Sequence, residues 1–184
     1  MINIDELDEK LARKIRRIDI GAKTVSNIYQ DLTYLTLNNQ IMSQNEKIDV
    51  SQIILQRVEY FTTLANVKHI EFNLNIEKDV FLFIDVKKLS KLIDNLISNA
   101  IKYNKINGFI NVELKQNYLS IEDSGKGIKK EQLQRLYDRY SRFDKTVGGF
   151  GIGLNIVSMI CKEYNLNIQI DSQIKIGTKV ELQW

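Results

Sequence analysis

The sequence has no proline, one cysteine and one histidine among its 184 residues. The single cysteine, Cys161, excludes an intramolecular disulfide and a cysteine-built zinc site, and the single histidine, His69, excludes a metal site made of several histidines. No apolar run approaches the roughly 18 residues that cross a bilayer. The formal net charge is only +3, from 26 basic and 23 acidic residues, so we expect no nucleic acid partner. With 43% hydrophobic residues, the chain is nevertheless long enough to bury a core.

The first 37 residues carry apolar side chains at alternating spacings of three and four, with one extra residue after Leu11. This pattern predicts a long coiled-coil-like helix. Because its other faces are charged or amidic, we expect the apolar stripe to pack against a partner helix; the alternative is a helix lying on its own domain. A polar stretch at 36–47 predicts a linker, so we place helix and linker at 1–45 and a second domain at 46–184.

The second domain alternates helical and β-like segments without the regular spacing of βαβ units. Asp49, with Gln52 three residues later, predicts a helix start. The segments predict an α+β fold, a two-layer α/β sandwich in which helices cover one face of a single mixed sheet. The expected helices are one that follows Asp49 and runs through Ile53 to about Asn66, one at 86–103, a short one near 131–137, and one at 154–164. The expected strands are 70–76, 80–84, 109–114, 118–122, 166–170 and 179–184.

The helix at 86–103 places Asn95, Asn99 and Lys102 on one face, with Tyr103 at its edge. An amide oxygen can hold a metal ion, an ammonium group can neutralise phosphate, and an aromatic ring can pack on a base. This set of side chains is typical of a nucleotide site, and a solvated helix face is the alternative.

A carboxylate and two glycines follow the strand at 118–122, in the order Asp123, Gly125 and Gly127. A buried Asp at a strand end can accept a hydrogen bond from an exocyclic amine, and glycines let the backbone approach a flat ring. A simple turn is the alternative. The motif is not the dinucleotide fingerprint, because no third glycine follows.

A second glycine-rich segment, 148–154, leads straight into an apolar helix. Closely spaced glycines and a helix N-terminus let backbone N–H groups point at phosphate oxygens. The segment is not a Walker A loop, because no Lys-Ser/Thr follows the last glycine. Cations between the two glycine segments predict a lid over the phosphates, although a solvated loop would explain the charges alone. They are Lys126, Lys129, Lys130, Arg135, Arg139, Arg142 and Lys145.

Taken in order, these motifs resemble the ATP-binding domain of bacterial sensor histidine kinases, in the superfamily that includes gyrase-type and Hsp90-type ATPases. The asparagine box resembles 95–103, the first glycine box 123–128, the phenylalanine box 136–144 and the second glycine box 149–154. The resemblance covers about 48–184 and implies the Bergerat-type sandwich. It also implies that the first helix is the second helix of a dimerisation and phosphoacceptor hairpin.

The resemblance implies ATP and Mg²⁺ as cofactors and gives roles to particular residues. Asn99 would hold Mg²⁺, Lys102 would meet phosphate, Tyr103 would pack near the adenine, and Asp123 would accept from the adenine amino group, supported by Thr178. The other implied nucleotide-binding residues are Gly125, Gly127, Ile128, Phe150, Gly151, Ile152, Gly153 and Leu154, and the implied catalytic residues are Asn95, Arg139 and Arg142.

Three residues depart from the family pattern, and one further position distinguishes two branches of the superfamily. Tyr137 and Tyr140 replace phenylalanines in the lid box, and Phe150 stands where a small hydroxyl residue is common. The ATP-hydrolysing branch carries a glutamate one turn before the magnesium asparagine, where this chain has Asn95. An amide cannot take a proton, and the adjacent Asp94 points about 100° away around the helix, so we expect slow hydrolysis.

His69 lies at the start of a strand rather than on a hairpin helix, so we do not expect it to be the phosphoacceptor. The acceptor helix is expected upstream of Met1 or on another protein. The expected partners are that helix, a response regulator and a second copy of the chain, and the expected location is the cytoplasmic portion of an inner-membrane sensor. The alternatives are a nucleotide-free dimerisation or docking module, and a serine-directed kinase of the same superfamily.

Overall fold

The computed structural model describes residues 43–133 and 152–184, together with scattered positions between 11 and 33. The chain divides into two compact units, Met1–Met42 and Ser43–Trp184. The described positions of the first unit are helical. Four residues of its apolar stripe, Leu11, Ile18, Val25 and Tyr29, are 45–71% accessible, and Ile15 is half-buried.

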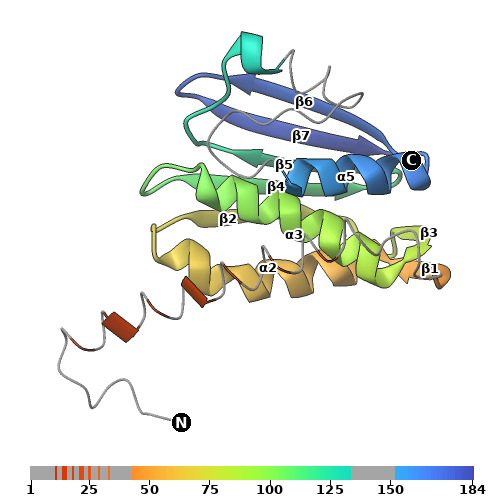
Figure 1. The fold of residues 1–184 in the computed structure, drawn as a ribbon. Coiled ribbons are helices and arrows are strands. Elements are labelled where there is room, and N and C mark those ends of the chain that lie inside the picture. Colours follow the sequence, from red (N-terminus) through yellow and green to blue (C-terminus); the bar gives the residue numbers. More distant parts are fainter. Residues whose placement is uncertain are drawn as a thin grey trace. The chain divides into compact units, whose positions relative to one another are not determined.

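The second unit is built on a five-stranded sheet in the order β2-β4-β5-β7-β6 (Figure 1). β2 runs parallel to β4, and the other neighbours are antiparallel, so the sheet is mixed, as the sequence predicts. Asn117, in the β4–β5 turn, has a positive φ of 60°, a conformation that asparagine tolerates. The strands are β2 (Glu71–Ile76), β4 (Phe109–Lys115), β5 (Tyr118–Asp123), β6 (Asn167–Gln173) and β7 (Gly177–Gln183).

A separate two-stranded sheet corrects the prediction of a single sheet. β1 (Asn45–Asp49) pairs antiparallel with β3 (Phe81–Asp85), so the expected linker at 36–47 overlaps a strand and β3 lies outside the main sheet. β1 has one apolar residue, Ile48, which lies opposite Leu82. Backbone pairing with β3, which local composition does not reveal, therefore forms this strand.

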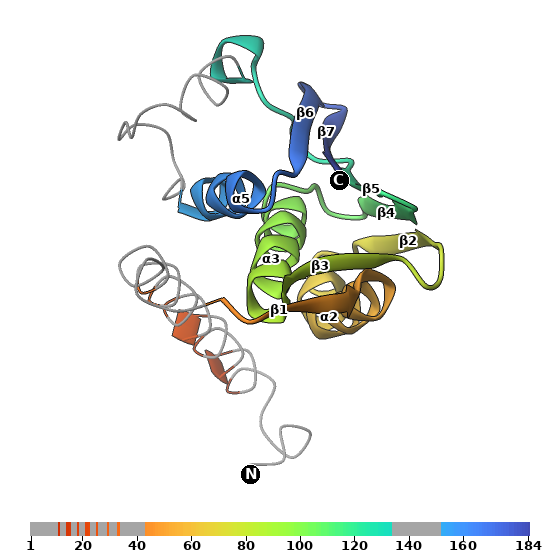
Figure 2. The same ribbon diagram turned by 90° about the vertical axis from the view of Figure 1, so that its right-hand side faces the viewer.

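Three helices, α2 (Val50–Asn66), α3 (Val86–Lys102) and α5 (Ile152–Glu163), cover one face of the main sheet (Figures 1 and 2). Asp49 caps α2 by accepting from the Gln52 N–H at 3.2 Å, which confirms the predicted start. The core between helices and sheet is aliphatic and almost fully buried, which confirms the two-layer α+β sandwich. It includes Ile54, Leu92, Ile93, Ile97, Ile110, Leu114, Leu119, Ile156, Ile160 and Leu182.

The segment after β5 begins a helix at 130–133, where the sequence predicts a short helix, and residues 134–151 lie outside the described residues. None of the described helices is both long enough and apolar enough to cross a membrane.

Candidate functional site

The asparagine face of α3 is fixed by the cap and the buried stripe of that helix. Asp85 caps α3 by accepting from the N–H groups of Lys87 and Lys88 at 2.8 and 3.2 Å. Asn95 is 7% exposed, and its Nδ2 donates to the Lys91 carbonyl oxygen at 2.8 Å. Asn99, one turn later, is half-buried, and its side-chain amide has no hydrogen-bond partner among the described residues. Its amide oxygen is therefore available to a ligand.

The start of α5 lies directly against this face. A Cβ atom on Gly153 would stand 2.5 Å from Asn95 Oδ1, closer than real Cβ atoms come to other atoms. A Cβ here would force the Asn95 amide to shift, so glycine lets α5 begin against α3 with that amide in its place. The first N–H groups of a helix lack intrahelical acceptors and carry partial positive charge, so the described start of α5 presents an anion-attracting end beside Asn95. Leu154, the next residue, is half-buried.

Asp94, the neighbour of Asn95, is held on another side of α3. Arg57 of α2 donates to both carboxylate oxygens of Asp94, with the second bond at 2.9 Å. Burial raises the pKa of Asp94 although the guanidinium opposes that shift. The carboxylate is occupied by Arg57, which confirms that it points away from the asparagine face.

The carboxylate of the predicted site, Asp123, ends β5 and is 8% exposed. Its Oδ1 accepts from the Gly125 N–H at 2.8 Å, and the N–H of Thr178, opposite it on β7, also donates to the carboxylate. Burial raises the pKa of Asp123 despite these two donors. A desolvated carboxylate with lone pairs remaining is a strong acceptor for an amine.

The turn after Asp123 depends on glycine at two close approaches. A Cβ on Gly125 would stand 2.3 Å from the carbonyl oxygen of Tyr103, which accepts from the Lys126 N–H at 3.1 Å. Gly127 has a φ of 67°, and a Cβ there would stand 2.1 Å from the carbonyl oxygen of Gln173. The turn is thus clamped between the end of α3 and the β6–β7 hairpin, and a larger residue would push it away from both.

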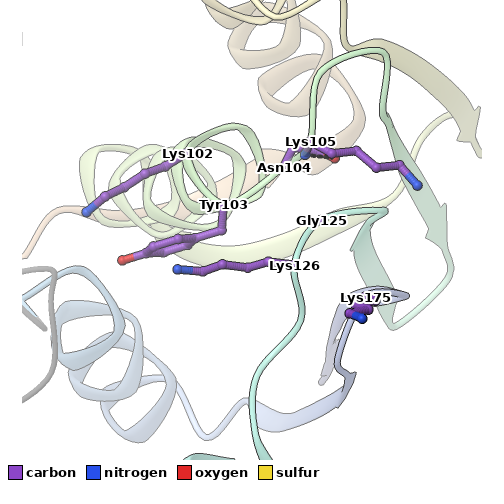
Figure 3. A pocket seen from close by; sticks show the side chains of 7 residues that line it. All are labelled: Lys102, Tyr103, Asn104, Lys105, Gly125, Lys126 and Lys175. Carbon is purple, nitrogen blue, oxygen red and sulfur yellow. Dashed lines mark hydrogen bonds between the residues drawn. The ribbon is translucent and has the colours of Figure 1, made fainter.

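An open pocket of about 380 Å³ lies where this turn meets the end of α3 (Figure 3). The ammonium groups of Lys102 and Lys126 stand 5.0 and 4.7 Å from the centre of the Tyr103 ring, and Figure 3 shows their side chains on either side of it. The described lining contains no acidic residue, so the pocket attracts anions beside an aromatic ring. The lining residues are Lys102, Tyr103, Asn104, Lys105, Gly125, Lys126 and Lys175.

Two buried polar residues that the sequence analysis missed support this pocket. The Ser124 hydroxyl donates to Asn104 Oδ1 at 3.1 Å and accepts from the Phe109 N–H at 2.8 Å. Asn104 Nδ2 in turn donates to the Phe109 carbonyl oxygen at 3.0 Å. Ser124 lies within the first glycine box and Asn104 directly follows the asparagine box, and these positions are the signal that could have identified them.

Ser172 of β6 was also missed, and no sequence signal identifies it. Its hydroxyl accepts from the Ile128 N–H at 2.8 Å and lies 2.8 Å from Thr178 Oγ1. It thereby joins the first glycine segment to the last hairpin. Pairing of β6 with β7 brings these residues together.

Several predicted site residues lie where the structure does not describe the chain or its side chains. Arg139, Arg142, Phe150 and Gly151 lie outside the described residues, and only the backbone of Ile152 is described. No cluster of three or more metal-ligating His, Cys, Asp or Glu side chains occurs within the described ranges.

Comparison with known proteins gives the family. Residues 84–184 match the family "Histidine kinase-, DNA gyrase B-, and HSP90-like ATPase". The sensor histidine kinase WalK of Bacillus subtilis (strain 168) is 32% identical over 139 residues, which are 70% of this chain and 22% of WalK. The histidine protein kinase SaeS of Staphylococcus aureus (strain USA300) is 24% identical over 169 residues, covering 85% of this chain and 48% of SaeS. The chain thus spans less than half the length of these relatives.

A solved structure, that of full-length ShkA in complex with AMPPNP, shares the fold with a TM-score of 0.71 at 17% identity, over 96% of this chain and 39% of that one. The family match covers the asparagine face of α3, both glycine segments and the last hairpin. The chain belongs to the family of histidine kinase-, DNA gyrase B- and HSP90-like ATPases, and its predicted resemblance to the catalytic ATP-binding domain of a histidine kinase is confirmed.

Proposed function

We propose that this chain binds Mg·ATP between α3, the glycine turn after β5 and the start of α5, and donates the γ-phosphoryl group to a histidine of a sensor kinase hairpin. The packing of Gly153 against Asn95 carries the proposal, because it sets a helix N-terminus beside the Asn95 carboxamide, one helical turn before Asn99. AMPPNP, the ligand named for ShkA, is an ATP analogue.

Asn99 is the residue that would hold Mg²⁺. Its half-buried amide oxygen has no partner among the described residues, and Mg²⁺ prefers oxygen ligands, with few from protein and the rest from phosphate and water. Bound there, the ion would neutralise charge on the phosphate oxygens. Asn95 would stand beside it.

The remaining residues take the roles that the motifs predict. Lys102 would meet phosphate, Tyr103 would pack near the adenine, and Asp123 would accept from its amino group. Further lining would come from Gly125, Gly127, Ile128, Phe150, Gly151, Ile152, Gly153, Leu154 and Thr178, and Arg139 and Arg142 would reach the γ-phosphate.

In the reaction, an imidazole nitrogen of the acceptor attacks the γ-phosphorus, the bond from that phosphorus to the bridging oxygen breaks, ADP leaves, and the phosphorylated ring releases a proton. The chain contributes positioning and charge neutralisation. Asn95 cannot accept a proton, and Asp94 is paired with Arg57, so no described carboxylate on this face activates water.

The acceptor histidine lies on a helix that this sequence does not contain. His69 is exposed in a turn after α2, with a φ of 52°, and is not on a helix. The apolar stripe of the first helix would pair with the acceptor helix and with a second copy of the chain. In this proposal, the unit at 1–45 is a dimerisation helix with its linker, 46–184 is the catalytic domain, and the chain is the cytoplasmic part of a membrane sensor that serves a response regulator.

Titration with a non-hydrolysable ATP analogue, with and without Mg²⁺, tests the proposal. We expect micromolar to millimolar binding, and a loss of its Mg²⁺ dependence in Asn99→Ala. Asn75→Ala, which removes a carboxamide from the outer face of the sheet, is the matched control. No binding by the parent chain at millimolar nucleotide would refute the proposal. A phosphotransfer assay with a supplied hairpin domain against a supplied serine-bearing partner separates the histidine kinase from a serine-directed kinase.

A further inference from the structure

We infer that Lys68, on the turn between α2 and β2, is a positioning residue for the nucleotide pocket. Its ammonium group holds the C-terminal end of α3 and thereby sets the place of Lys102 and Tyr103. The inference rests on the proposed function of that pocket.

The contacts of Lys68 converge on the end of one helix. Its Nζ donates to the carbonyl oxygens of Ile101 and Lys102, both at 2.9 Å, and approaches that of Asn104 at 3.4 Å. The last carbonyls of a helix have no intrahelical donors, and a cation there also interacts favourably with the helix dipole. One part-buried side chain therefore supplies a donor to the Lys102 carbonyl and a further donor to the Ile101 carbonyl, which also accepts from the Asn104 N–H at 3.3 Å.

Backbone hydrogen bonds hold the turn that carries Lys68, so the side chain extends toward α3 from a fixed backbone position. His69 adopts a φ of 52°, and its N–H donates to the Asn66 carbonyl oxygen at 3.1 Å, which closes the end of α2. The Lys68 carbonyl oxygen accepts from the Asn107 N–H at 3.0 Å. Both the backbone and the side chain of Lys68 thus contact the segment that follows α3.

The segment held by Lys68 is the one that builds the pocket. Between the bonded carbonyls lies that of Tyr103, which accepts from the Lys126 N–H of the glycine turn at 3.1 Å. Lys68 on one side and the glycine turn on the other therefore clamp residues 101–104. Without Lys68, this segment can shift, and the Lys102 carbonyl loses its ammonium donor near a pocket that must receive an anion.

Binding of a non-hydrolysable ATP analogue with Mg²⁺ to Lys68→Met, in the full 184-residue chain, tests the inference. We expect roughly tenfold weaker binding, and recovery of most of it in Lys68→Arg, whose guanidinium can still donate to carbonyls. Val58→Ala, which opens a small cavity in α2, is the control for lost stability and should bind like the parent. In nucleotide-free protein, Lys68→Met should also speed amide hydrogen exchange at Tyr103 and Lys126.

The outcomes separate this inference from the proposed function. If the parent binds nucleotide and Lys68→Met binds within about twofold of it, with unchanged exchange at Tyr103 and Lys126, the inference is wrong and the proposed function stands. Equal weakening by Lys68→Met and Val58→Ala would make Lys68 merely structural and also refutes it. No binding by the parent overturns both.

Discussion

Replacing Gly125 with alanine tests the geometry of the pocket by adding a single methyl group. The new Cβ would stand 2.3 Å from the Tyr103 carbonyl oxygen and 2.6 Å from Asp123 Oδ1, whereas ordinary contact begins at 3.4 Å. The obstacle on one side is backbone at the end of α3, which Lys68 also holds. The glycine turn must therefore retreat by about 1 Å.

That retreat would weaken both hydrogen bonds by which the turn is held, one to Tyr103 and one to Asp123. The 3.1 Å bond from the Lys126 N–H to Tyr103 and the 2.8 Å bond from the Gly125 N–H to Asp123 would lengthen beyond good geometry. Overpacking of this kind costs about 1–3 kcal/mol of unfolding free energy, or several degrees of melting temperature in a chain of this length. Because the Asp123 carboxylate and the Tyr103 ring are displaced together, ATP affinity should fall by about 10- to 100-fold.

Thermal unfolding and nucleotide titration measure the two effects, with Gly21→Ala as the matched control. Gly21 is helical, and a Cβ there would meet nothing within 4 Å, so its alanine variant should be neutral or more stable by up to about 1 kcal/mol. If Gly125→Ala melts with the parent and binds ATP within about twofold of it, the close approach does not shape the pocket and the reasoning fails.

Three further predictions follow from the described contacts. Asp123→Asn should weaken ATP binding by about tenfold or more. The variant should nevertheless melt no lower than the parent at pH 7, because burial raises the pKa of Asp123, so that the ionised carboxylate costs stability once the pH has risen through that pKa. A lower melting temperature of the variant at pH 7 would contradict this reasoning. Arg57→Met should lose about 1–3 kcal/mol of unfolding free energy, measured in urea at pH 7, and this loss should shrink as Asp94 protonates at low pH. A loss that does not depend on pH would show that the Arg57–Asp94 ion pair does not cause it. Burial raises the pKa of Cys161 to about 12, so iodoacetamide at pH 8 should label it only in denaturant, and fast labelling of folded protein would contradict its burial.

Residues on one element were well predicted, because helical spacing alone relates them. The apolar stripe of α3 was predicted and is buried. Asn95 and Asp94 point in different directions because successive residues of a helix are about 100° apart. The strands of β4 and β5 were likewise predicted, at 109–114 and 118–122, and Asn117 lies in the short turn between them.

Contacts between distant elements could not be predicted in the same way. β1 has little strand character and forms because β3 supplies a pairing edge. The ammonium of Lys68 reaches α3 from more than thirty positions away in sequence, and Ser172 meets Ile128 across a comparable separation. Such contacts depend on the order of strands in the sheet, which a single sequence does not encode locally.

The glycines show how the two kinds of information combine. In the sequence they indicate backbone that can approach a ligand. In the structure, Gly125 also marks a place where backbone, the Tyr103 carbonyl, comes too close for a Cβ. Gly153 marks a place where the Asn95 amide would have to shift to admit one. The pocket is thus bounded by contacts between protein elements before any ligand enters. Substitutions that keep every charged and amide group but add a methyl at these glycines should therefore disrupt the site as effectively as removing those groups.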